Sequence, residues 1–224
     1  MSARADIAKQ LKIHLSGLHG LPRGFAATEV ADDIKAEAPA IESLAYEASN
    51  CRKCRLCETR KSVVFGVGNT TRPPIAFVGE GPGADEDRQG EPFVGRAGAL
   101  LTAAITKGLN LRREDVYICN VVKCRPPENR TPLPDEVESC LPFLFGQLRA
   151  IRPQTIITLG APAQKALTGD RGGITKIRGT WQEWEGVPLM PTFHPAYILR
   201  NAEAKRPFWD DLREVMRHLG IEAQ

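Results

Sequence analysis

Residues 74–87 read P-I-A-F-V-G-E-G-P-G-A-D-E-D, and they indicate the class of fold. The apolar run of residues 74–80 ends among glycines, a pattern typical of a buried strand that leads into a loop. Further strands are predicted at residues 115–122, 155–159 and 187–193, and helices at 96–108, 134–150, 161–167 and 206–219. Strands separated by helices predict an α/β fold with a mainly parallel sheet covered on both faces.

The composition favours a globular chain in a reducing compartment. Apolar residues make up 42% and charged residues 25% of the 224 residues, which is the balance of a packed domain. No apolar run approaches the ~18 residues that would span a membrane. Lys9, Lys12 and His14 interrupt every apolar stretch near the N-terminus, so a secretory signal is not indicated. We expect a cytoplasmic protein whose cysteines bind metal or lie buried.

The first 45 residues differ from the rest. Helical patches at residues 7–18 and 28–41 are separated by a stretch with Gly and Pro at 17–24. We expect an appended, partly helical arm at residues 1–45, followed by the main domain at residues 46–224.

The net charge of +3 is too small for a protein that coats nucleic acid, so any DNA-binding charge must be concentrated on one face. The candidate basic loops carry Lys123, Arg125 and Arg130, then Lys176 and Arg178, then Arg200, Lys205 and Arg206. A solvated mixed-charge surface is the alternative for each of these residues.

In parallel α/β sheets, ligands bind beyond the carboxyl ends of the strands. The glycine-rich turn at residues 79–87 follows the first predicted strand, where it would let the backbone approach a planar ligand and expose N–H groups. Glu80 would project into the same crevice. The spacing is not G-x-G-x-x-G, so dinucleotide binding is poorly supported, and an ordinary turn remains the alternative.

The motif H-P-A-Y-I-L-R at residues 194–200 follows the last predicted strand. His194 there could donate a hydrogen bond to a developing anion. An apolar wedge of Tyr197, Ile198 and Leu199, followed by Arg200, suits insertion into a base stack with a phosphate contact. The alternative is a histidine that caps a turn beside ordinary core residues.

Two further residues could contact a base. Phe93 lies in a Gly/Pro loop and could stack on a base, or it could anchor that loop in the core. Asn120 ends the second predicted strand, and its amide offers a donor and an acceptor side by side. An Asn that only caps the strand end is the alternative.

The cysteines suggest a metal site. Cys51 and Cys54 form a C-x-x-C pair, Cys57 follows, and Cys124 and Cys140 lie far downstream. A zinc ribbon would supply a second close pair, so thiolates from distant segments suit an iron–sulfur cluster at least as well. Cys119 lies inside a predicted strand and is expected to be buried.

Together these motifs resemble the type-4 uracil-DNA glycosylases of bacteria and archaea. The resemblance spans residues 48–211 and rests on C-R-K-C-R-L-C (51–57), V-F-G-V-G-N (64–69), V-G-E-G-P-G-A-D-E-D (78–87), G-E-P-F-V-G-R-A-G (90–98), Y-I-C-N-V-V-K-C-R-P-P-E-N-R (117–130) and F-H-P-A-Y-I-L-R-N (193–201). It implies an α/β/α sandwich with a four-stranded parallel sheet, and a 4Fe–4S cluster. The cluster ligands it implies are Cys51, Cys54, Cys124 and Cys140.

The resemblance also implies roles at the site. Glu80 and His194 would be catalytic, Phe93 would stack on uracil, and Asn120 would read its edge. Gly81, Pro82 and Glu86 would complete the uracil site, with Glu86 near C5 of the base. Tyr197, Ile198, Leu199 and Arg200 would contact DNA.

This sequence differs from two other branches of the superfamily, and each difference narrows the mechanism that we expect. Gly81 stands where the best-known branch has Asp, which leaves Glu80 as the nearest carboxylate. Residues 123–131 lack the histidine through which a related branch captures abasic DNA, so turnover is expected.

The resemblance implies a monomer that hydrolyses the N-glycosidic bond of uracil in single- or double-stranded DNA and binds no membrane. A metal-stabilised DNA-binding module without catalysis is the alternative, since it would keep the cysteines and the basic loops.

Overall fold

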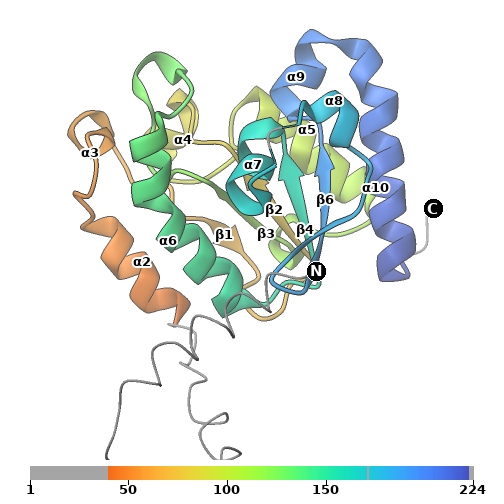
Figure 1. The fold of residues 1–224 in the computed structure, drawn as a ribbon, viewed down its shortest axis with the longest axis horizontal. Coiled ribbons are helices and arrows are strands. Elements are labelled where there is room, and N and C mark those ends of the chain that lie inside the picture. The colour runs from red at the N-terminus through yellow and green to blue at the C-terminus, as the bar shows by residue number, and fades with distance from the viewer. Residues whose placement is uncertain (1–39, 171, 222–224) are drawn as a thin grey trace, which may run out of the picture. The chain divides into compact units, whose positions relative to one another are not determined.

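A computed structural model describes residues 40–170 and 172–221 of the chain (Figure 1). The helical patch expected at residues 7–18 and most of the one at 28–41 lie outside this part. The strands are β1 (Val67–Gly68), β2 (Ile75–Gly79), β3 (Tyr117–Asn120), β4 (Thr155–Leu159), β5 (Gln182–Trp184) and β6 (Val187–Thr192). The longer helices are α2 (Ile41–Ser49), α5 (Arg96–Ala103), α6 (Pro134–Ile151), α7 (Ala161–Thr168) and α10 (Lys205–Leu219). The shorter ones are α3 (Leu56–Thr59), α4 (Ala84–Gln89), α8 (Ile174–Ile177) and α9 (Pro195–Arg200), with single turns at Ala104–Gly108, Arg113–Asp115, Pro127–Asn129 and Ala202–Ala204.

The strands form one six-stranded sheet in the order β1-β3-β2-β4-β6-β5. The pairs β3–β2, β2–β4 and β4–β6 are parallel, so the predicted parallel sheet is confirmed as the centre of this sheet. The edge strands β1 and β5 run antiparallel to their neighbours and were not predicted. They span only two and three residues, too few to show an alternating pattern in the sequence.

Helices cover both faces of the sheet, and the alternation of side chains along β2 assigns them. Ala76 and Val78 face a cluster that includes Leu144 of α6 and Ala163 of α7. Ile75 and Phe77 face a cluster that includes α5 and α10. The layers are therefore those of an α/β/α sandwich.

Helix α2 packs on α6 through its buried residues Leu44 and Ala48. A Cβ added to Gly146 of α6 would lie 3.0 Å from Leu44 Cδ1, so a glycine allows the close approach of the two helices. The expected division at residue 45 falls inside α2. The separation of an arm from the main domain stays a prediction, because most of residues 1–45 lie outside the described part.

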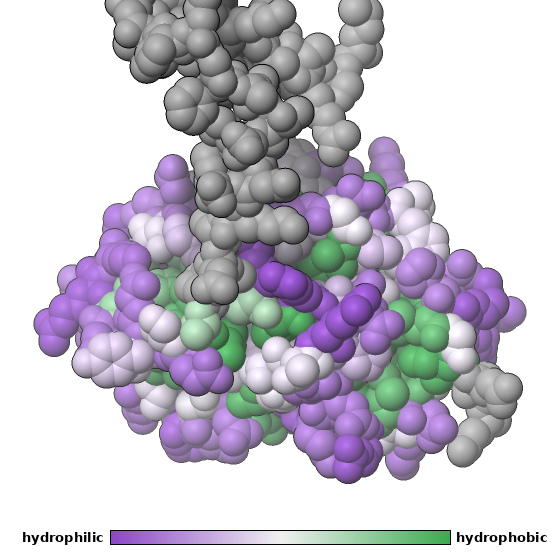
Figure 2. Space-filling model, turned by 90° about the horizontal axis from the view of Figure 1, so that it is seen from below, coloured by the Kyte–Doolittle hydropathy of each residue, from purple (hydrophilic) through white to green (hydrophobic). Residues whose placement is uncertain are grey.

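Figure 2 shows the molecule from the amino ends of the parallel strands, and this face is mostly hydrophilic with smaller hydrophobic areas. The carboxyl ends of the strands lie at the opposite side of the sheet. No helix in the described ranges is both long and apolar enough to cross a membrane.

Candidate active site

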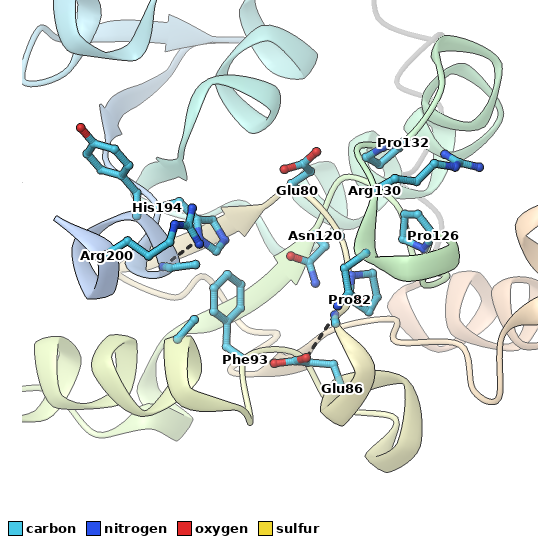
Figure 3. Close-up of a pocket in the computed structure, with 16 residues that line it drawn as sticks. Glu80, Pro82, Glu86, Phe93, Asn120, Pro126, Arg130, Pro132, His194 and Arg200 are labelled. Atoms are coloured by element: carbon cyan, nitrogen blue, oxygen red, sulfur yellow. Dashed lines mark hydrogen bonds between the residues drawn. The ribbon is translucent and has the colours of Figure 1, made fainter.

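A cavity of about 450 Å³ lies at the carboxyl ends of β2, β3 and β6 (Figure 3). It brings together most of the site residues that were predicted from segments far apart in the chain. These are Glu80, Gly81, Pro82, Glu86, Phe93, Asn120, His194, Tyr197 and Arg200. The cavity is also lined by residues for which no site role was predicted, among them Ala97, Pro126, Asn129 and Pro132. Most of these residues follow β3 in the proline-rich stretch before α6. Their position after a parallel strand is the sequence feature that could have identified them.

Asn120 supplies an unpaired acceptor to this cavity. It pairs with Gly79 in the parallel ladder and is only 2% exposed. Within the described residues, its Oδ1 has no hydrogen-bond partner. A buried acceptor without a donor is costly, so this atom suits a ligand that brings an N–H group.

Gly79 keeps the space around that amide open. A Cβ at this position would lie 2.4 Å from Asn120 Oδ1 and 2.6 Å from Phe93 Cζ. Any other residue here would therefore displace both side chains. Gly79 is the last residue of β2.

Phe93 is held in an uncommon backbone conformation, with φ at 54°. Arg113 fixes it from one side, since its Nη2 donates to the carbonyl oxygens of Pro92 at 2.7 Å and Phe93 at 3.2 Å. Helix α5 packs so closely that a Cβ on Gly98 would lie 1.9 Å from Phe93 O. The surroundings thus stabilise a strained turn that presents the ring beside His194, with ring centroids 5.6 Å apart.

Glu86 braces the same loop. Its Oε1 accepts hydrogen bonds from Val94 N and Gly95 N, both at 3.2 Å. Its Oε2 accepts one from Gly83 N at 3.1 Å, at the start of α4. The carboxylate therefore ties the glycine-rich turn to the Phe93 loop, while the side chain still lines the cavity.

His194 is a neutral donor at the N-cap of α9. Its Nδ1 accepts a hydrogen bond from Ala196 N at 3.1 Å, which leaves the ring proton on Nε2. The pKa of His194 is lowered to about 4, mainly by burial and also by the charge of Arg200, while Glu86 opposes both. The imidazole is therefore uncharged at neutral pH and can donate from Nε2.

Glu80 is half-buried directly after β2. Its side chain points toward Pro132 and away from Asn120 (Figure 3). Burial raises the pKa of Glu80 above its ordinary 4.5, and Thr131 opposes this. Its Oε1 is buried and has no hydrogen-bond partner among the described residues.

The expected apolar wedge is only partly exposed. Tyr197 and Leu199 are 37% and 44% exposed, but Ile198 is 4% exposed and packs in the core. These residues lie on helix α9, where successive side chains are about 100° apart, so three in a row cannot share one face. The prediction that Ile198 contacts DNA is therefore wrong in this conformation.

Two of the basic candidates are engaged inside the protein. Lys123 is 2% exposed, and its Nζ donates to Asn120 O at 2.6 Å. Arg178 pairs with the buried carboxylate of Asp211 and donates to Pro207 O at 2.6 Å. Neither side chain is free for a phosphate. Arg130 lines the cavity but also forms an ion pair with the buried Glu136, N to O 2.7 Å.

The cysteines gather at a second, smaller cavity beside the N-terminal half of α6. Cys51, Cys54, Cys57, Cys124 and Cys140 line it. Cys119 is buried in the core among apolar side chains, as expected. Arg60 Nη1 donates to Cys124 Sγ at 3.0 Å, and Lys123 N donates to Cys140 Sγ at 3.3 Å. Burial raises the pKa of the Cys124 thiol to about 11, with Arg60 opposing.

The thiols at this cavity are chemically suited to hold an iron–sulfur cluster. Within residues 40–170 and 172–221, no three His, Cys, Asp or Glu side chains are grouped tightly enough to hold one ion. A 4Fe–4S cluster binds each of its four thiolates at a different iron, so its ligands are spread around a cavity. Lys53, Arg60 and Lys123 also line this cavity, and their charge suits an anionic cluster.

Comparison with known proteins places the chain among enzymes of one kind. The family model of the uracil DNA glycosylase superfamily matches residues 65–213. A type-4 uracil-DNA glycosylase of Thermotoga maritima is 48% identical over 179 residues, which cover 78% of this chain and 92% of that protein. One from Saccharolobus solfataricus is 42% identical over 80% of this chain and 86% of its own length. A type-5 uracil-DNA glycosylase of Pyrobaculum aerophilum is 32% identical over 66% of this chain and 72% of that protein.

Proposed function

This chain belongs to the uracil-DNA glycosylase superfamily and to its type-4 enzymes, and from this premise we propose how its residues excise uracil in DNA repair. The enzyme hydrolyses the bond between uracil N1 and deoxyribose C1′, which releases free uracil and leaves an abasic site. It acts as a monomer on single- or double-stranded DNA. To reach the bond in a duplex, it extrudes the uracil nucleotide into the 450 Å³ cavity.

The unpaired Oδ1 of Asn120 is the observation that supports uracil as the ligand. It accepts the hydrogen bond of uracil N3–H, and the amide nitrogen donates to uracil O4. Phe93 stacks on the base, and Gly81 and Pro82 bring the backbone to its edge. Cytosine lacks the N3 proton, so the same acceptor disfavours it.

Cleavage moves negative charge onto uracil O2 and positive charge onto the sugar. The neutral imidazole of His194 donates from Nε2 to O2 as this charge develops. Backbone N–H groups near Gly81 assist. Glu80 stabilises the sugar cation or accepts the proton of the attacking water, a task for which a raised pKa is favourable.

The rim of the cavity binds the DNA. Tyr197 and Leu199 are exposed on α9 and fill the space that the extruded nucleotide leaves. Arg200, at the end of the same helix, neutralises a phosphate. Glu86 lies near C5 of the base, where it crowds a methyl group.

A 4Fe–4S cluster is held by Cys51, Cys54, Cys124 and Cys140. When bound, it supplies cross-links between the segment before α3, the segment after β3 and helix α6. Arg55 supports the same arrangement, because it directly follows Cys54 and pairs with Asp135 of α6 at 2.9 Å. This chain's own residues carry out the cleavage.

The test is incubation of the purified protein with uracil-containing oligonucleotides, without added metal or nucleotide. Free uracil and alkali-sensitive abasic sites are expected. A protein that binds the oligonucleotide but releases no uracil would be the DNA-binding module considered above.

A further inference from the structure

A second large cavity lies behind the uracil pocket, between helices α6 and α7. Its volume is about 420 Å³. Val137 and Leu141 of α6 and Ala161 and Ala166 of α7 form its apolar walls. We define this space as the α6–α7 cavity. Nothing described so far uses it.

The two cavities share a wall. Glu80 and Pro132 line both the uracil pocket and the α6–α7 cavity. The Glu80 side chain points away from Asn120, toward Pro132 (Figure 3). Its buried Oε1 has no hydrogen-bond partner among the described residues, although the Thr131 hydroxyl lies close enough to the carboxyl to lower its pKa. A water molecule in the α6–α7 cavity would supply that partner.

The uracil pocket offers the water little room once DNA is bound. An extruded nucleotide fills the pocket, and the DNA covers the rim at Tyr197 and Arg200. The α6–α7 cavity opens on the other side of Glu80 and stays free of the base. Its walls are mainly apolar, and the polar side chains that line it are Glu80, Thr131, Glu138 and Lys165.

We propose that the attacking water reaches the reaction centre through the α6–α7 cavity and is received there by Glu80. This inference rests on the proposed function. The water oxygen bonds to C1′ as the C1′–N1 bond breaks, and the bonding pair leaves with uracil. Glu80 takes the water's proton and returns it to solvent by the same route.

The choice of nucleophile tests the route. Methanol competes with water, and attack by methanol leaves a 1-O-methyl sugar in place of the ordinary abasic sugar. A mainly apolar passage discriminates against one extra methylene by about tenfold or more. The ratio of methyl to hydroxyl product therefore reports the width of the path that the nucleophile takes.

Two variants change this width in opposite directions. Ala166→Phe narrows the α6–α7 cavity, and we expect it to lower the methyl-to-hydroxyl ratio about tenfold and to slow uracil release at saturating DNA. Leu141→Ala widens the cavity and is expected to raise the ratio by a similar factor. Ala150→Phe is the control, because it places the same bulk elsewhere on α6. Its methyl-to-hydroxyl ratio should equal that of the unmodified protein.

A ratio that is the same in the unmodified protein and in the variants would overturn the proposal, because the nucleophile would then arrive through the mouth of the uracil pocket. Absence of any methyl product both in the unmodified protein and in Leu141→Ala would overturn it too. If Ala166→Phe does not fold, Leu141→Ala alone decides. Failure of the unmodified protein to release uracil at all would instead contradict the proposed function.

Discussion

The uracil pocket and the cysteine cavity lie at the two ends of residues 120–124. They differ in whether their buried polar atoms and sulfurs are hydrogen-bonded. Asn120 ends β3 in the pocket, and Cys124 lies in the cysteine cavity. The pocket leaves polar atoms unpaired, whereas the cysteine cavity ties its sulfurs to Arg60 and to the backbone. Between them, the buried Nζ of Lys123 donates to the carbonyl of Asn120.

The unpaired polar groups of the pocket lower the stability of the folded protein. An unsatisfied buried polar atom costs about 1–3 kcal/mol, so the surrounding structure must be stable enough to hold it. The segments that carry the cysteines supply that stability next to the site. Changes at the cysteine cavity should therefore affect folding most, and changes in the pocket should affect the reaction most.

The largest effect is expected at the cysteines. Ser in place of Cys51, Cys54, Cys124 or Cys140 should lower both the iron content and the soluble yield, since loss of a ligand also releases a folded segment. Iron and sulfide per protein, with absorbance near 400 nm, measure this. Cys57→Ser and Cys119→Ser are the controls. Bleaching by Cys57→Ser but not by Cys51→Ser or Cys54→Ser would show that the ligand set is wrong.

His194→Ala should slow the reaction while the cluster stays bound, although it also removes the side-chain cap of α9. Loss of one donor to the developing anion slows cleavage by about 10²–10³-fold. Single-turnover uracil release measures the rate, and the visible spectrum of the cluster should match that of the unmodified protein. Undiminished release would remove His194 from the mechanism.

The pocket should also discriminate against thymine. We propose that Glu86 lies near C5 of the base. Its carboxylate is fixed by backbone amides of two loops, so it would not yield to a 5-methyl group. Thymine opposite guanine is expected to be released very poorly compared with uracil opposite guanine in the same duplex. Efficient thymine release would refute the position assigned to Glu86.

The pH dependence separates the two catalytic candidates. The pKa of Glu80 is raised above 4.5, so its carboxylate is lost as pH falls through that raised value. Uracil release should then fall by about tenfold per pH unit below it. His194, with a pKa of about 4, stays neutral over most of that range and cannot cause the decline. Glu80→Gln should abolish the fall of the rate at low pH. If the fall persists in that variant, Glu80 is not the group whose protonation stops the reaction.

A smaller effect is expected at Arg113, which touches the Phe93 loop from outside the pocket. Arg113→Met leaves the carbonyls of Pro92 and Phe93 unpaired, which costs about 1–3 kcal/mol and loosens the stacking ring. KM for uracil-DNA should rise more than kcat falls, and Arg113→Lys should recover part of the loss. Arg112→Met, a change at an exposed neighbour, is the control. If Arg113→Met and Arg112→Met have equal KM and kcat, Arg113 does not position the Phe93 loop.

Much of this molecule follows from local patterns in the sequence. Apolar runs locate the parallel strands, and β4 was predicted at its observed bounds of Thr155–Leu159. Because ligands bind at the carboxyl ends of parallel strands, the residues after those strands were singled out as a site. Glu80, Asn120 and His194 do line one cavity.

Other features depend on contacts between distant segments, and only the tertiary structure decided them. Lys123 and Arg178 look like surface cations in the sequence, yet one is buried under β3 and the other pairs with Asp211 of α10. Ile198 lies in an apolar run whose middle residue faces the core once α9 forms. A sequence pattern shows the periodicity of each helix or strand and the order of these elements along the chain. Which side chain is buried, and what it pairs with, is set by neighbours that packing brings together from elsewhere in the chain.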